Sequence, residues 1–548
     1  MMNNMNPETP ELTNEEKMAR GSAWMTIGNI GSRLLGVIYI LPWMYWLGDD
    51  QLQANALFSM SYNIYALFLM ISTAGLPSAV AKQVAYYNSI HEYKTSQQVF
   101  KRALQLMAVL GVAFAVLMYF SAPFLARHSG GGANLIPSMR TLSVAVLVIP
   151  VMSVIRGYFQ GLQNVAPFAI SQLVEQVARV LYMLISTFVI MRLGSGNYVT
   201  AVTQSTFGAF IGALASIAVL MYFLQKERAK LNVLADLSPN KVKVDTTRLL
   251  LQTIKEAVPF IIVGSGITIY KIVDQVTFIR TMQHFTTYTK EQLSALFALF
   301  SANPDKLVMV VIGLATSIAA VGLPLVTEAF AKKDDLGLAR LTTNNLQLYA
   351  FIMLPSTLGM ILLAYPLNTL FYQPNHLGTN LLIIAALSGL LQGLFMMTSS
   401  MLQGIYRNSS AILYFAIGLL VKIISQVPLI YLLESYGPLL STTLGFGVTC
   451  YLNLRKLHQE TRFNKNLTFR RVVLITLMTL AMLIFAGVTR GIFGLFLDPE
   501  RKAQSFLLIM VVALAGVITY VYLALKVRIA DKLLGSKMAA LRQKLKIK

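Results

Sequence analysis

The chain has 548 residues, of which 56% are hydrophobic and only 12% are charged. A soluble domain is about 45–50% apolar and about 25% charged, so this composition, with a mean hydropathy of +0.62, excludes soluble and disordered proteins. The net charge of +22 would favour a nucleic-acid partner in a soluble protein. In a membrane protein it follows from basic cytoplasmic segments, and no nucleic-acid partner is expected.

Apolar runs long enough to cross a membrane recur along the whole chain, since a helix needs about 20 apolar residues to span one. Residues 1–21 carry four glutamates, unlike the basic start of a signal peptide, so the first apolar run is expected to remain as a span. The sequence therefore predicts an all-α integral membrane protein. The fourteen predicted spans are 22–47, 54–81, 103–126, 139–160, 168–191, 199–224, 251–279, 305–330, 344–372, 379–404, 409–433, 437–454, 471–489 and 504–525.

The distribution of Lys and Arg residues indicates the orientation of these spans. If the N-terminus is inside, the inside segments hold far more of these residues than the outside loops do. Cytoplasmic loops of membrane proteins carry such an excess. The sequence therefore predicts an even number of spans with both termini in the cytoplasm.

The two halves of the chain repeat each other. Gly75-Leu-Pro matches Gly322-Leu-Pro, and Gln160-Gly161 matches Gln403-Gly404 about 243 residues further on. A repeat of six spans keeps the same orientation in both copies, as in transporters with a site between two halves. We expect two parallel six-helix lobes around a central cavity, plus two extra C-terminal helices. The predicted parts are an N-terminal lobe (1–224), a cytoplasmic linker (225–256), a C-terminal lobe (257–455), two additional spans (456–526) and a basic cytoplasmic tail (527–548).

Charged residues inside the predicted spans are the candidate substrate-binding residues, because a charge at bilayer depth must face a partner, water or a ligand. Arg33 has no acidic residue within four positions and is the strongest candidate. Each of the others has a structural alternative: a pair within one helix, packing, or an anchor at the membrane interface. The remaining candidates are Glu175 and Arg179, Lys271 and Asp274, Asp305 and Lys306, and Lys422.

Two of these pairs are predicted from spacing alone. Glu175 and Arg179 are four residues apart, which favours an ion pair within one helix over cavity lining. Lys271 and Asp274 are three apart, and they either neutralise each other or line a cavity. Cations outnumber acids among all these residues, which favours an anionic, phosphate-bearing substrate. An exporter of cationic drugs would instead need an unpaired acid in the first spans.

Enzymatic and metal chemistry find little support in the sequence. The histidines all fall in predicted loops, the single Cys450 cannot form an internal disulfide, and a Walker A motif is absent. No metal or cofactor is therefore expected. A membrane glycosyltransferase would need clustered acids, but Asp49-Asp50 and Asp334-Asp335 fall on opposite faces of the predicted topology. The tail 526–548 is either an amphipathic helix on anionic lipids or plain topogenic charge.

The sequence resembles the MOP exporter superfamily and, within it, the polysaccharide-flippase branch that includes SpoVB-like and MurJ-type lipid II flippases of Gram-positive bacteria. The resemblance spans essentially the whole chain. The strings that carry it are Ser32-Arg33-Leu-Leu-Gly36, Gly75-Leu-Pro-Ser-Ala-Val-Ala-Lys82, Arg156-Gly-Tyr-Phe-Gln-Gly-Leu-Gln-Asn164 and Val174-Glu175-Gln176.

The resemblance implies that a cationic cavity binds the substrate's pyrophosphate and sugars, and that the final two spans form a groove for its polyprenyl tail. It implies alternating access, driven by the membrane potential or an ion gradient. Arg33 matches the family's first-span arginine, and Asp305-Lys306 resembles its Asp-Arg pair. Tyr39, Ile40 and Ile71 stand where related flippases carry charged residues, and Lys271 is a candidate to compensate.

The function predicted from the sequence is translocation of an undecaprenyl-pyrophosphate-linked peptidoglycan precursor to the outer leaflet of the bacterial cytoplasmic membrane. Arg33, Lys271 and Lys306 would hold the phosphates. The alternatives are a flippase for a capsule or teichoic acid unit and a multidrug exporter of the same superfamily. The expected partners are the polyprenyl-linked glycan lipid, anionic membrane lipids and the cell-wall synthesis machinery.

Overall fold

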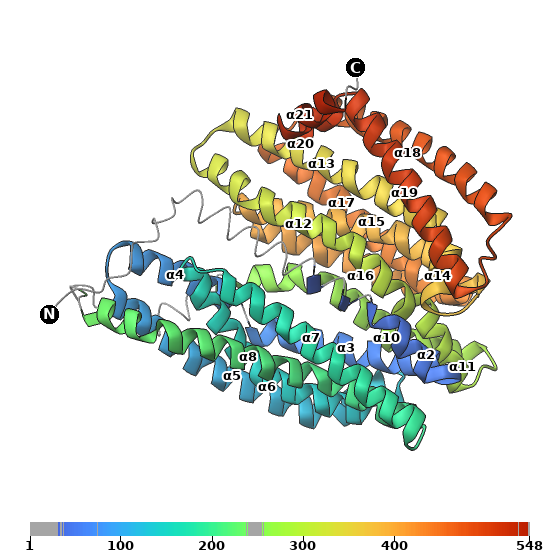
Figure 1. The fold of residues 1–548 in the computed structure, drawn as a ribbon, viewed down its shortest axis with the longest axis horizontal. Helices are drawn as coiled ribbons and strands as arrows, with labels where there is room; N and C mark the ends of the chain where they lie inside the picture. Colours follow the sequence, from blue (N-terminus) through green and yellow to red (C-terminus); the bar gives the residue numbers. More distant parts are fainter. Residues whose placement is uncertain are drawn as a thin grey trace. The chain divides into compact units, whose positions relative to one another are not determined.

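The computed structural model describes residues 31–545 except 33, 34, 37, 74, 237, 239–254, 256 and 535. Within these residues every regular element is helical (Figure 1). The all-α prediction is thereby confirmed. The chain divides into two compact units, which are described one at a time. Unit 1 contains residues 1–46, 64–125 and 133–261, and unit 2 contains residues 47–63, 126–132 and 262–548.

Unit 1 is a bundle of long helices. Its helices are α2 (Ile40–Leu47), the second half of α3 (Gln51–Thr73), α4 (Leu76–Ser89), α5 (Tyr93–His128), α6 (Leu135–Gly161), α7 (Ala166–Phe188) and α8 (Tyr198–Asp236). α8 packs against α6 and α7, and α4 packs against α6. An apolar core joins α4, α5 and α6 through buried residues such as Val84, Met107 and Tyr158. Pro77 and Pro167 lie in the first turns of α4 and α7, where a missing backbone N–H costs nothing.

Unit 2 holds the first half of α3 and all helices from α10 onward. These helices are α10 (Gly266–Phe285), α11 (Lys290–Phe297), α12 (Asn303–Ala331), α13 (Asp335–Leu362), α14 (Ala364–Phe371), α15 (His376–Gly404), α16 (Asn408–Leu433), α17 (Gly437–Thr461), α18 (Lys465–Gly494), α19 (Lys502–Lys526), α20 (Ile529–Leu534) and α21 (Ser536–Lys544). α15 packs against both α12 and α17, and α16 packs against α10 and α17. The last two long helices, α18 and α19, lie side by side and join α13 and α20 in one apolar core (Figure 1).

The predicted count of fourteen spans is not confirmed. Within the described residues, eleven helical stretches are long and apolar enough to cross a membrane, or twelve if a bent pair counts as one span. One of these stretches, Asn408–Thr461, contains both α16 and α17, which were predicted as separate spans. The first predicted span, 22–47, begins before the described residues.

Two irregular backbone segments lie next to charged residues of unit 2. A π-helical turn (Ala298–Ala302) links α11 to α12. Pro304 follows it in the first turn of α12 and supplies no N–H, which favours such a widened turn. The second segment is a bend of 46° at Ser265, between Ala257–Gly264 and α10, where two glycines flank a serine. The two irregularities precede Asp305-Lys306 and Lys271 in the chain.

The internal repeat is visible as matching contacts within each unit. Gly161 and Gly404 are the last residues of α6 and α15. A Cβ at Gly161 would lie 2.7 Å from the Val84 side chain, and a Cβ at Gly404 would lie 3.0 Å from Thr327. Thr327 lies in the segment that follows Gly322-Leu-Pro, as Val84 lies in the segment that follows the matching Gly75-Leu-Pro. The same close helix approach therefore recurs in both halves, as the duplicated sequence predicts.

Candidate functional site

Seven of the eight sequence-predicted site residues fall within the described part of the chain. Arg33, the eighth, lies outside it. Glu175 and Arg179 belong to unit 1, whereas Lys271, Asp274, Asp305, Lys306 and Lys422 belong to unit 2. The candidate site is therefore built from the five residues of unit 2, which come from α10, α12 and α16.

The charged side chains of unit 2 form two ion pairs between helices. Lys271 Nζ lies 2.5 Å from Asp305 Oδ2, and Lys422 Nζ lies 2.7 Å from Asp274 Oδ1. Of the two alternatives for Lys271 and Asp274, the structure does not show mutual neutralisation within α10. Tertiary packing brings Asp305 of α12 to Lys271 and Lys422 of α16 to Asp274, so each residue finds its partner on another helix.

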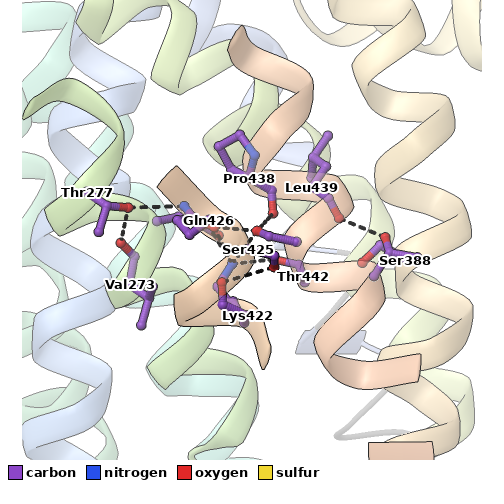
Figure 2. A network of polar contacts seen from close by, with 12 residues as sticks. Val273, Thr277, Ser388, Lys422, Ser425, Gln426, Pro438, Leu439 and Thr442 are labelled. Atoms are coloured by element: carbon purple, nitrogen blue, oxygen red, sulfur yellow. Dashed lines mark hydrogen bonds and ion pairs between the residues drawn. The ribbon is translucent and has the colours of Figure 1, made fainter. Parts of the chain in front are cut away.

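Lys422 lies within a polar network with Gln426 and Thr442 (Figure 2), and it pairs there with Asp274, whose side chain is 10% exposed. The Lys422 side chain has 0% exposure, and its ammonium also donates to Thr442 Oγ1 at 2.6 Å. Gln426 Nε2 donates to Asp274 Oδ1 at 2.8 Å and to Thr277 Oγ1 at 3.1 Å. The Ser441 hydroxyl in turn donates to Gln426 Oε1.

This network gives each buried charge the partners that it needs in a low-dielectric interior. The Tyr270 ring adds a cation–π contact, with its centroid 5.4 Å from Lys422 Nζ. Because the ammonium is enclosed and bonded on several sides, Lys422 ties α16 to α10 and α17. Its contacts are those of a structural cation rather than of a residue that meets substrate.

The Lys271–Asp305 pair lines a cavity, which Asp274 also borders. The two side chains are 15% and 30% exposed, and the cavity between α10, α12, α15 and α17 has a volume of about 40 Å³. A cavity of that size holds a few water molecules and no larger ligand. Lys271 is hence neutralised by the Asp305 carboxylate at the edge of a small cavity.

Lys306 belongs to a second polar cluster, formed with the first half of α3. Its ammonium donates to Asn55 Oδ1 at 2.7 Å, and Asn55 Nδ2 donates to Asn303 Oδ1 at 2.5 Å. The Phe58 ring lies 5.4 Å from Lys306 Nζ. Asn55 and Asn303 are 0% and 2% exposed. The Lys306 ammonium is thus bonded to a buried pair of side-chain amides inside unit 2.

A further amide contact joins α3 to α10. Asn63 Nδ2 donates to Gln275 Oε1 at 3.1 Å, and Gln275 Nε2 donates to the Met60 carbonyl at 3.2 Å. Sequence reasoning missed these amides because it searched for charges. Four side-chain amides within otherwise apolar runs, each able to donate and accept, were the signal that would have found them.

In unit 1, Glu175 pairs with another helix instead of its own. Arg156 Nη2 of α6 lies 2.7 Å from Glu175 Oε2, and the same nitrogen donates to Ser216 Oγ of α8 at 2.9 Å. The predicted Glu175–Arg179 ion pair within α7 is therefore wrong. Arg179 lies one turn further on, where a Cβ at Gly212 of α8 would come within 3.0 Å of Arg179 Cβ. The Arg156–Glu175 contact holds α6, α7 and α8 together.

The candidate site of unit 2 contains lysine ammonium groups whose partners are side-chain oxygens that an anionic ligand can replace. Lys271 is held by one carboxylate and Lys306 by a neutral amide, and both are partly exposed. Ammonium groups of this kind bind phosphate oxygens through charge-assisted hydrogen bonds. The arrangement suits an anionic ligand that takes the place of Asp305 and Asn55.

A family model described as "Polysaccharide biosynthesis protein" matches residues 18–330 of the chain. The lipid II flippase MurJ of Bacillus subtilis (strain 168) is 30% identical over 535 residues, which are 95% of this chain and 97% of that protein. The sequence likeness therefore extends over both units and includes the C-terminal helices.

Solved structures show the same fold. The inward closed conformation of lipid II flippase MurJ has a TM-score of 0.60 at 15% identity, covering 93% of this chain and 99% of that one. The inward-facing conformation of a multidrug resistance MATE family transporter of the MOP superfamily has a TM-score of 0.60 at 16% identity, covering 78% and 94%. At these identities the likeness shows the fold alone, and it confirms the predicted multi-pass membrane transporter fold.

Proposed function

The chain belongs to the polysaccharide biosynthesis protein family, and on that premise we propose that it moves lipid II, an undecaprenyl-pyrophosphate-linked peptidoglycan precursor, from the inner to the outer leaflet. It is a transporter and not an enzyme. The observation that supports lipid II as the substrate is the near full-length relationship to a protein named as a lipid II flippase. The partly exposed cations of unit 2 support an anionic head group.

In this proposal Lys271 and Lys306, together with Arg33, hold the pyrophosphate. Before substrate binds, Asp305 neutralises Lys271 and Asn55 accepts from Lys306. The pyrophosphate displaces both oxygens, and its release lets them return. Because Asp305 and Asn55 compete with the substrate, the cations are never left bare in a low-dielectric interior, where an unpaired charge is costly.

The proposal includes a source of energy. With the outside positive, the membrane potential favours inward return of the empty, cationic protein by about 2.3 kcal/mol per charge per 100 mV. When a pyrophosphate is bound, its negative charge compensates the cations of the site. The membrane potential therefore opposes outward movement of the loaded protein less. Transport is accordingly expected to slow when the potential is removed.

The proposal also places the chain in the bacterial cytoplasmic membrane with both termini in the cytoplasm. The excess of Lys and Arg in the segments assigned to the inside supports this orientation. The predicted lobes, linker and tail are part of the same proposal, as is an association with the cell-wall synthesis machinery.

The test uses purified protein in vesicles that contain labelled lipid II, with translocation measured as label that becomes accessible to a membrane-impermeant reagent. The wild-type chain should translocate lipid II, whereas Lys306→Gln should not. Lys226→Gln, which removes an exposed lysine of α8, is the matched control and should keep full activity. Transport of a lipid-linked capsule or teichoic acid unit without transport of lipid II would contradict the proposed substrate.

A further inference from the structure

A second basic cavity lies in unit 2, away from Lys271 and Lys306. It has a volume of about 570 Å³, within the range of about 300–1,000 Å³ that small-molecule sites have. Its walls come from α13, the connection between α17 and α18, the start of α18, and α20. All four charged residues that line it are basic: Arg340, Arg462, Arg471 and Lys532.

These four cations have no ion-pair partner among the described residues. Two carboxylates on adjoining elements are engaged elsewhere. Glu460 pairs with Arg407 at 2.9 Å and with Lys456 at 2.8 Å, and Asp531 pairs with Arg542 at 2.9 Å. Four like charges in one cavity repel each other, so a bound anion would relieve this repulsion.

The local backbone directs further positive character into the cavity. Asn464 caps α18 by accepting from the Leu467 N–H at 2.9 Å, so the N-terminus of this helix opens at the cavity wall. Helix N-termini favour anions through their unpaired N–H groups. Arg462 has a φ of +49°, in the left-handed region that favours glycine. The chain nevertheless has an arginine at this position, where its side chain lines the cavity.

The cavity is also fixed in shape by contacts between its walls. Arg471 Nη1 donates to Gln347 Oε1 at 2.5 Å, and the Asn464 N–H donates to Thr343 Oγ1 at 3.2 Å. Both contacts join α18 to α13. The buried residues Ile529 and Ala530 anchor α20 in the apolar core of α13, α18 and α19, which holds Lys532 at the rim.

We propose that this cavity, named here the Arg340 pocket, binds a phosphate ester and is distinct from the transport site. Arginine forks match phosphate oxygens, and basic pockets between membrane helices bind the head groups of anionic lipids. Phosphate esters reach such a pocket either on a lipid of the same leaflet or as soluble metabolites. Occupancy would join α13, α18 and α20 and stabilise this end of unit 2.

The experiment measures thermal unfolding of the purified full chain in detergent, titrated with phosphatidylglycerol, phosphatidylcholine or glycerol 1-phosphate. Phosphatidylglycerol should raise the Tm saturably, and phosphatidylcholine should not. Arg340→Gln with Arg462→Gln should weaken this binding on the order of 100-fold, since a hydrogen bond to a charged group contributes about tenfold or more. Lys333→Gln with Arg470→Gln removes two exposed cations outside the pocket and should leave the affinity unchanged.

The two sources of phosphate are separated by competition. If glycerol 1-phosphate stabilises the chain with the same dependence on Arg340 and Arg462, the pocket takes a soluble phosphate ester. If only the lipid does so, the pocket takes a lipid head group. Should the double variant not fold, Lys532→Gln changes one exposed side chain and should weaken binding about tenfold. Equal stabilisation of the pocket and control variants, or by both lipids, would overturn the proposal.

Discussion

Asp274 lies one helical turn from Lys271 on α10, yet its carboxylate pairs with Lys422 of α16 at 2.7 Å. Lys271 in turn pairs with Asp305 of α12. Lys271 and Asp274, one turn apart on α10, therefore belong to two different ion pairs between helices. The Lys422 ammonium is fully buried and holds helices together, whereas Lys271 and Asp305 are partly exposed at a cavity that Asp274 also borders.

Loss of the enclosed cation should destabilise the protein strongly. Lys422→Ala leaves Asp274 buried without its counter-ion, which costs about 3–5 kcal/mol in comparable buried pairs. Thermal unfolding of the purified chain should show a large fall in Tm. Lys422→Met combined with Asp274→Asn removes both charges and should recover most of it.

The matched control for that substitution is Lys332→Ala. Lys332 pairs with Glu328 at the surface, where both side chains are more than half exposed. Exposed pairs contribute little to stability, so the Tm should not change. An equal loss of Tm in Lys422→Ala and Lys332→Ala would show that the polar network of α10, α16 and α17 does not stabilise the fold.

The two members of the cavity pair should have opposite effects on substrate binding. Lys271→Gln removes a phosphate ligand and should weaken lipid II binding by about tenfold. Asp305→Asn removes the competitor for Lys271 and should tighten binding. Equilibrium binding of lipid II to each purified variant measures both effects. Weaker binding in Asp305→Asn would mean that Asp305 contributes to the site as a ligand or support, and not as a competitor.

Asn55 allows a test of Lys306 that does not change the lysine itself. Asn55→Asp keeps the size of the side chain and replaces the amide that accepts from Lys306 with a carboxylate. The new ion pair neutralises Lys306, so transport should fall although the protein remains folded. Vesicle translocation and Tm are measured together. Full transport by a folded Asn55→Asp variant would exclude Lys306 as a phosphate ligand.

The repeated helix approach predicts a graded effect of added methyl groups. A Cβ at Gly161 would lie 2.7 Å from the Val84 Cβ and 2.8 Å from the Ala81 carbonyl oxygen, whereas at Gly404 the nearest atom is a flexible end of Leu323. Gly161→Ala should therefore lower the Tm more than Gly404→Ala. Gly487→Ala, which adds a methyl group to open space on α18, should not lower it. The reverse order would show that α4 and α6 separate easily.

The sequence predicted the class of fold more reliably than the pairing of its charged residues. Apolar runs and the repeat depend on local composition, so the helices and the matched Gly161 and Gly404 contacts followed from them. Ion pairs depend on which helix faces which. Spacing along α10 therefore left a pair of Lys271 with Asp274 open, whereas packing supplies Asp305. The amides of the site, such as Asn55, escaped notice because neutral polar residues carry no charge signal.

The most direct test of the central claim is made in cells whose only lipid II flippase is this chain. Surface-accessible and total lipid II are measured in the same samples, before and after depletion. We predict that depletion lowers accessible lipid II while total lipid II rises, and that the wild-type chain, but not Lys306→Gln at equal membrane levels, restores accessibility. Unchanged accessibility on depletion would contradict the assignment of lipid II as the substrate.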